Sequence, residues 1–131
     1  MTGYVGNIET ATLGNSYFRQ VIFTGSHSQL VVMCLGPSED IGMEMHPDVD
    51  QFFRIDAGSG KVVINGTEHK ISNGSAIVIP AGAKHNVIND GTEDLKIYSI
   101  YSPPHHADKT IHKTKQDALN DKEHFTGKTT E

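Results

Sequence analysis

Histidine is unusually frequent in this chain, whose 131 residues include eight histidines and no tryptophan. Histidine is the commonest metal ligand in proteins, and its side chain titrates near neutral pH. His46 follows Glu44 by two residues, a spacing that places both side chains on the same side of a β-strand. A carboxylate is both a metal ligand and a proton acceptor, so the positions of the histidines and of their acidic neighbours decide which chemistry is available to the chain.

An all-β domain is expected to position these side chains. Short runs rich in Val, Ile, Phe and Tyr alternate with turn residues, as is typical of strands on a half-buried surface. The nine candidate strands are 17–24, 29–35, 42–46, 51–57, 61–65, 67–71, 76–79, 85–89 and 95–102. Asn65-Gly66 marks a hairpin, because both turn residues must accept a positive φ. Short strands at this spacing predict a sandwich or closed barrel rather than βαβ units.

The segments around the strands differ in composition. Residues 1–16 are expected to form an N-terminal arm, residues 17–102 the barrel, and residues 103–131 a polar C-terminal tail. The tail contains one candidate short helix at 114–123, with Thr114 as N-cap and Asp117 completing a weak capping box. The last few residues are expected to be frayed.

Composition argues against several classes of partner. The formal net charge is -5 with acids and bases interspersed, whereas nucleic-acid backbones require a basic face. No apolar run approaches the ~20 residues that span a bilayer, and the N-terminus lacks the basic flank and apolar core of a signal peptide. Cys34, the only cysteine, lies in an apolar run, so we expect a small buried hydrophobe. We therefore expect a cytoplasmic protein with a small-molecule ligand and no nucleic-acid or membrane partner.

A specific pattern of residues lies between positions 74 and 89. Its members Gly74, Pro80, Gly82, His85 and Asn89 have the spacing G-x5-P-x-G-x2-H-x3-N. Here the chain resembles the cupin superfamily, whose second motif has this form. The resemblance implies a small antiparallel β-barrel or jelly roll, with His85 opening a strand and pointing into the barrel.

The first motif of the same superfamily, G-x5-H-x-H-x3,4-E-x6-G, is matched with departures. The aligned positions, in motif order, are Ser38, Glu44, His46, Gln51 and Gly58. The resemblance therefore implies one divalent metal ion, namely Fe, Mn, Ni or Zn, with ligands Glu44, His46, Gln51 and His85. Asp50 competes with Gln51, because the motif also allows three intervening residues. The alternative is a degenerate pocket that has lost the metal, although both replacements are oxygen donors.

Further side chains are candidates for contact with substrate. Glu44 is the candidate catalytic base, and Arg19, Tyr101 and His106 are the candidate substrate-binding residues. Arg19 would pair with a carboxylate or phosphate, although such a strand residue more often faces solvent. The histidines that follow Pro103-Pro104 are His105, His106 and His112. They either fold over the barrel mouth or, as is more usual, are solvated loop residues.

The fold alone does not give the function. The chain is similar to small stand-alone cupins that are often labelled mannose-6-phosphate isomerase-like. One hypothesis is an isomerase- or epimerase-like metal enzyme acting on a small polar metabolite, such as a sugar, a sugar phosphate or a hydroxy or keto acid. The others are an iron-dependent dioxygenase and a non-catalytic small-molecule binding or sensor protein. Since small cupins commonly pair through sheet edges or exchanged N-terminal strands, we also predict a homodimer.

Overall fold

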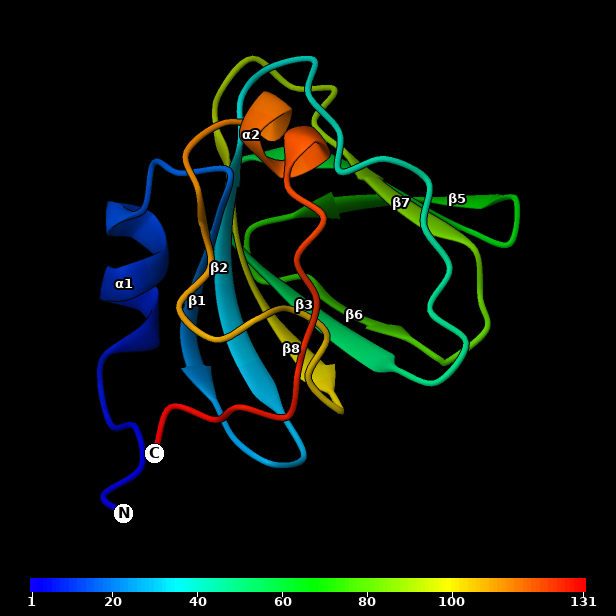
Figure 1. Ribbon diagram of the computed structural model, residues 1–131. Coiled ribbons are helices and arrows are strands. Elements are labelled where there is room, and N and C mark those ends of the chain that lie inside the picture. The colour runs from blue at the N-terminus through cyan, green and yellow to red at the C-terminus, as the bar shows by residue number, and fades with distance from the viewer.

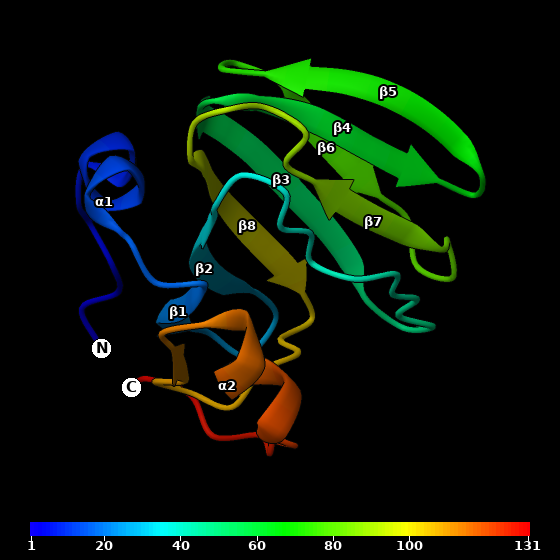
Figure 2. The same cartoon turned by 90° about the horizontal axis from the view of Figure 1, so that it is seen from above.

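Two antiparallel sheets face each other in the computed structural model, which describes residues 1–131 (Figure 1, Figure 2). One sheet has six strands in the order β6-β3-β8-β2-β1-β9, and the other has three in the order β5-β4-β7. The strands are β1 (Arg19–Thr24), β2 (Gln29–Leu35), β3 (Asp50–Ala57), β4 (Ser59–Ile64), β5 (Thr67–Ser72), β6 (Ala76–Ile79), β7 (His85–Ile88), β8 (Leu95–Ser102) and β9 (Ile111–His112). The predicted all-β jelly-roll fold is confirmed.

The core lies between the two sheets because the central strands alternate apolar and more polar residues. On β8, Leu95 and Ile97 are fully buried, and Ser99 and Tyr101 follow on the same inner face. Seventeen buried apolar residues form one continuous cluster, so the sheets enclose a single core. The same alternation carries Tyr101 to the end of the core, where its side chain is 1% exposed.

The N-terminal arm contains a helix that the sequence did not predict. Helix α1 (Ile8–Gly14) begins at Asn7, whose side chain accepts a hydrogen bond of 2.9 Å from Thr10 N. It packs against β2, β3 and β8 of the six-stranded sheet. Thr12 is its only buried residue, so the helix lacks the apolar stripe by which helices are predicted from sequence.

The predicted strand at 42–46 is wrong. Only one residue of this segment pairs with β7, through the single bridge of Glu44 with His85, and the other bridge, of Asp40 with Ile88, lies before it. Gly42 has a φ of 105°, a conformation that interrupts an extended strand. Glu44 and His46 therefore lie on a loop that crosses the end of the barrel.

The C-terminal tail returns along the six-stranded sheet, where β9 pairs with the edge strand β1. Helix α2 (Lys115–Asn120) has the predicted capping box of Thr114 and Asp117 but ends before residue 123. The last residues are not frayed, because Thr130 N donates to Thr24 O at 2.9 Å and Glu131 accepts from Thr2 N at 2.8 Å. Neither helix has the length and apolar character needed to span a membrane.

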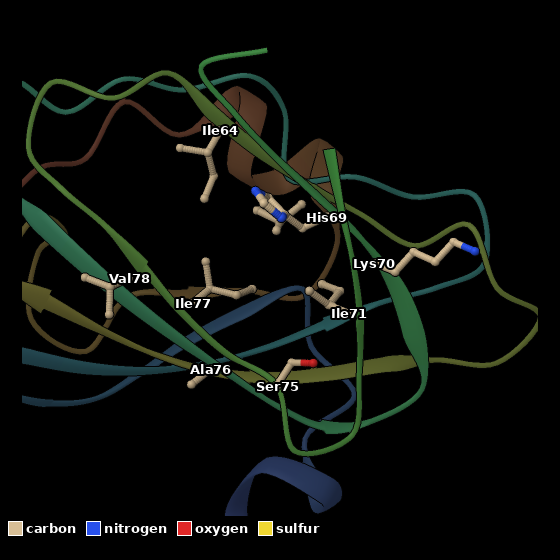
Figure 3. A pocket seen from close by; sticks show the side chains of 9 residues that line it. Ile64, His69, Lys70, Ile71, Ser75, Ala76, Ile77 and Val78 are labelled. Atoms are coloured by element: carbon tan, nitrogen blue, oxygen red, sulfur yellow. The ribbon is translucent and has the colours of Figure 1, made fainter. Parts of the chain in front are cut away.

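The two sheets remain open between their edge strands β5 and β6. A cavity of about 330 Å³ lies there, lined by Val62, Ile64, His69, Lys70, Ile71, Ser75, Ala76, Ile77 and Val78. Ile64 and Ile77 lie on opposite walls, and Lys70 points away from the cavity (Figure 3). Its walls are mainly apolar and contain no acidic residue, so the predicted metal chemistry does not reside here.

Candidate functional site

Glu44, His46 and His85 meet at one end of the barrel. Glu44 N donates to His85 O and His85 N donates to Glu44 O, both at 2.8 Å. Two residues paired in this way project their side chains from the same face, and His46 Nε2 lies 3.1 Å from Glu44 Oε2. Each of the three offers a ligand atom, and these atoms lie within 4.8 Å of one another. The cluster could therefore hold a metal ion.

The corner that carries His85 is fixed by backbone hydrogen bonds. Gly82 N donates to His46 O at 2.8 Å, and Ala83 N donates to Pro80 O at 3.1 Å. Gly82 has a φ of 89°, which an L-residue with a side chain adopts at a cost. The predicted proline–glycine corner thus brings the first and second motifs into direct contact.

His85 presents a nitrogen that has no partner. Its ring is 2% exposed, and Nδ1 lies 3.0 Å from Ala83 O. Since a carbonyl oxygen only accepts, Nδ1 carries the proton and Nε2 keeps its lone pair. Nε2 is buried without a hydrogen-bond partner, which is unfavourable for an acceptor. A metal ion fits this atom, because metal-bound histidines commonly donate their other N–H to a carbonyl.

Gln51, rather than Asp50, faces the barrel interior. Gln51 is 2% exposed, and its Nε2 donates to Ser99 Oγ at 3.0 Å. Its Oε1 is buried and has no partner. Asp50 is exposed and accepts from Ala81 N at 2.8 Å, because successive strand residues face opposite sides. The role of Gln51 as a ligand remains a prediction, which its unpartnered oxygen supports.

Glu44 supplies negative charge to the cluster. Its Oε2 lies 3.1 Å from His46 Nε2, and the side chains of Glu44 and His46 are 31% and 9% exposed. Burial opposes ionisation of Glu44, but the hydrogen bond from His46 and nearby positive charge, including that of Arg19, outweigh it, so its pKa is lowered. Glu44 is therefore ionised at neutral pH.

The C-terminal histidines are not solvated loop residues. The ring of His105 lies 4.3 Å from that of His46 and 5.5 Å from that of Tyr101, and His106 is 6% exposed. Gln29, itself buried, holds them there. Its Oε1 accepts from His105 N at 3.1 Å and from His106 N at 2.9 Å. The tail therefore covers the barrel mouth. Of the two alternatives for these histidines, folding over the mouth holds and solvation in a loop does not.

Glu123, which no sequence pattern marks, supports His106 and through it Tyr101. Glu123 Oε1 lies 2.6 Å from His106 Nδ1, Oε2 accepts from Ala107 N at 2.6 Å, and His106 Nε2 lies 3.1 Å from the Tyr101 hydroxyl. Burial lowers the pKa of His106, although Glu123 opposes this shift. Neutral His106 therefore donates from Nδ1 to Glu123, and its Nε2 accepts from Tyr101. Burial, with Glu44 and Glu123 adding to it and Arg19 opposing it, raises the pKa of Tyr101 to about 12.

Arg19 is supported in a similar way by the tail. It is 6% exposed, so the more usual expectation of a solvent-facing residue is wrong. Its Nη1 lies 3.2 Å from His112 Nδ1, and His112 Nε2 lies 3.0 Å from Asp121 Oδ2. Because a guanidinium only donates, His112 Nδ1 accepts from Arg19 and Nε2–H donates to Asp121. Asp121 and Glu123 thus each anchor one buried imidazole.

Known proteins are similar to this chain in sequence. A family model described as a cupin domain matches residues 31–101. The chain is 48% identical over 122 residues to the uncharacterized protein YrkC of Bacillus subtilis, covering 88% of this chain and 66% of YrkC. It is also 48% identical over 108 residues to an uncharacterized protein of Acanthamoeba polyphaga mimivirus, covering 79% of this chain and 67% of that one. The chain thus spans about two thirds of the length of these relatives.

A solved structure shares most of the chain's architecture. The crystal structure of BH2720 from Bacillus halodurans matches with a TM-score of 0.89 and 42% sequence identity. The match covers 90% of this chain and 94% of that one. The match is therefore too long to be confined to residues 17–102.

Proposed function

Because the chain belongs to the cupin family, we propose that it is a metal-dependent enzyme acting on a small polar metabolite by isomerase- or epimerase-like chemistry. The observation that carries this proposal is the buried, unpartnered His85 Nε2 beside Glu44 and His46. The proposed ligands of one divalent ion (Fe, Mn, Ni or Zn) are Glu44, His46, Gln51 and His85. When bound, such an ion polarises carbonyl or hydroxyl oxygens.

The protein's own groups supply the proton chemistry. Glu44 is ionised and 31% exposed at its side chain, so it can accept a proton from a metabolite bound beside it. The raised pKa keeps Tyr101 protonated at neutral pH. In its hydrogen bond with His106, the phenol oxygen retains a lone pair for a substrate hydroxyl. We propose that Glu44, whose carboxylate would either bind the ion or accept a proton, acts as the catalytic base when it leaves the ion, and that Tyr101 and His106 orient the substrate.

Turnover of a defined panel tests this proposal. Metal-loaded protein, chelator-treated protein and the Glu44→Gln variant would be incubated with sugars, sugar phosphates, and hydroxy and keto acids, and followed by NMR. We expect conversion of at least one compound by the loaded protein, loss on chelation, and a fall of about 100-fold or more in kcat for Glu44→Gln. No conversion of any compound by loaded protein would contradict the proposal. Oxygen uptake with iron but not zinc would favour the dioxygenase alternative.

An apolar row on the outer face of the six-stranded sheet is our proposed homodimer contact. Cross-strand pairing aligns Val78, Phe52, Ile100, Leu30 and Phe23 across five strands. Val78 is 66% exposed and the other four are partly exposed. The row contains no charged residue, so a second copy can pack against it without burying a charge.

A cytoplasmic location fits the one cysteine, which is buried and free.

Charging the centre of this row should separate the dimer. We expect light scattering to show a dimer for the wild type at micromolar concentration and a monomer for Phe52→Glu, because the new carboxylate would be buried in the contact. Leu119→Glu is the matched control, since Leu119 is 65% exposed on α2 outside the row. A monomeric wild type, or dissociation of the control alone, would contradict this contact.

A further inference from the structure

Arg19 is a buried cation that no carboxylate neutralises. Arg19 is 6% exposed, and none of the six ion pairs of the structure includes it. Its Nε is buried without a hydrogen-bond partner. Burying a charge without a counter-ion is strongly unfavourable. The guanidinium therefore has no directly paired anion within the protein, and the carboxylate of Glu44 acts on it only at longer range.

The neighbours of Arg19 orient the guanidinium without cancelling its charge. The Phe18 ring lies beneath it, with the guanidinium carbon 5.2 Å from the ring centroid. His112 accepts from Nη1 at 3.2 Å and is neutral in that role. Asp121 lies behind His112, with its side chain 49% exposed, so solvent screens its charge. One edge of the guanidinium is thus fixed while Nε stays unpaired.

The charge of Arg19 acts on the proposed catalytic site. Strand β1 turns Arg19 and Val21 toward the barrel interior, where both are buried. The positive charge of Arg19 contributes to the lowered pKa of Glu44 and opposes the rise in the pKa of Tyr101. Glu44 would already be balanced by a divalent ion, so the site would retain excess positive charge.

We infer that Arg19 anchors an anionic group, a carboxylate or a phosphate, on the metabolite that the site binds. This inference rests on the proposed function, because the metabolite's other oxygens would face Glu44, His46 and His85. A guanidinium suits this task, since its planar fork pairs with two oxygens of either anion. It selects sugar phosphates and hydroxy or keto acids over neutral sugars. His112 is a positioning residue that acts through Arg19.

Calorimetric titration of metal-loaded protein tests the inference, with lactate, inorganic phosphate and neutral glycerol as probes. We expect at least one anion to bind and glycerol to bind no more than weakly. The anion that binds identifies which of the two groups the site takes. Arg19→Gln should weaken anion binding at least about 30-fold, the loss typical of a buried charged hydrogen-bonded partner. Arg19→Lys keeps the charge but not the planar fork, so its anion affinity should lie between those of the wild type and Arg19→Gln.

Controls separate the possible failures. Lys61→Gln removes a partly exposed cation that pairs with Glu68 at 3.3 Å, and it should leave anion binding unchanged. Circular dichroism and elemental analysis of each variant establish folding and metal content. Loaded wild-type protein that binds neither anion more tightly than glycerol, or folded Arg19 variants that bind anions as well as the wild type does, would overturn the inference. If wild-type protein takes up no metal, the proposed function fails, and elemental analysis shows this before any anion is added.

Discussion

Replacing His85 by alanine is expected to lower the affinity of the protein for a divalent ion by more than about 100-fold, because even the loss of a residue that only supports a ligand costs 10- to 100-fold. His85 Nε2 is held ready for an ion, since Nδ1 is engaged with Ala83 O at 3.0 Å and Nε2 has no partner. Without this imidazole, His46 is the only histidine left in the cluster with Glu44. Competition with a chromophoric chelator measures the affinity.

His69→Ala is the matched control for this substitution. His69 lies on β5, is exposed, and stands outside the cluster, so its removal should leave metal affinity unchanged. Circular dichroism of the metal-free variants shows whether each has kept the fold. Folded His85→Ala that binds the ion as tightly as the wild type does would exclude His85 as a ligand.

Replacing Glu123 by alanine is expected to lower the free energy of unfolding by about 3 kcal/mol, because two hydrogen bonds to a charged carboxylate are lost and their donors stay largely buried. The change leaves His106 Nδ1 and Ala107 N without the acceptors that each now finds at 2.6 Å. Urea unfolding followed by circular dichroism measures the loss. Glu68→Ala is the control, because it removes a carboxylate that pairs with Lys61 and has a side chain that is 62% exposed. It should lower the free energy of unfolding by less than about 1 kcal/mol.

The contribution of Glu123 should also depend on pH. Burial opposes its ionisation, but hydrogen bonds from His106 and Ala107 outweigh burial and lower its pKa from 4.5 to about 2. Because the folded-state pKa lies below the unfolded value, the unfolded chain binds more protons in this window. The difference in stability between wild type and Glu123→Ala should therefore be full above pH 4.5 and shrink as the pH falls toward 2. A difference that is the same at pH 3 and pH 7 would contradict this account.

The sequence predicted much of the site because its signals there are local. Gly82 and His85 lie in one turn-and-strand pattern, and that corner contacts the segment of Glu44 and His46 as expected. Two-residue alternation likewise accounts for Gln51 facing inward while Asp50 faces solvent. Patterns of this kind are visible in a sequence because neighbouring residues alone determine them.

The hydrogen bonds that hold His106 and Arg19 in place could not be predicted, because they join residues that are distant in the sequence. Glu123 meets His106 across 17 positions, and Arg19 meets His112 across 93. No hydrophobic period or turn residue marks such pairs in advance. The buried histidines of the tail were therefore expected to be solvated, although Gln29 and the two acidic residues of the tail hold them inside.

Anomalous diffraction from crystals of manganese- or zinc-loaded protein shows whether one ion lies between Glu44, His46 and His85. We expect one strong anomalous peak inside the barrel mouth, with His46, His85 and Glu44 bonded to the ion and the Gln51 amide oxygen completing the set. A peak bound instead by His105 or His112, or loaded crystals that show no ion between residues 44 and 85, would contradict it.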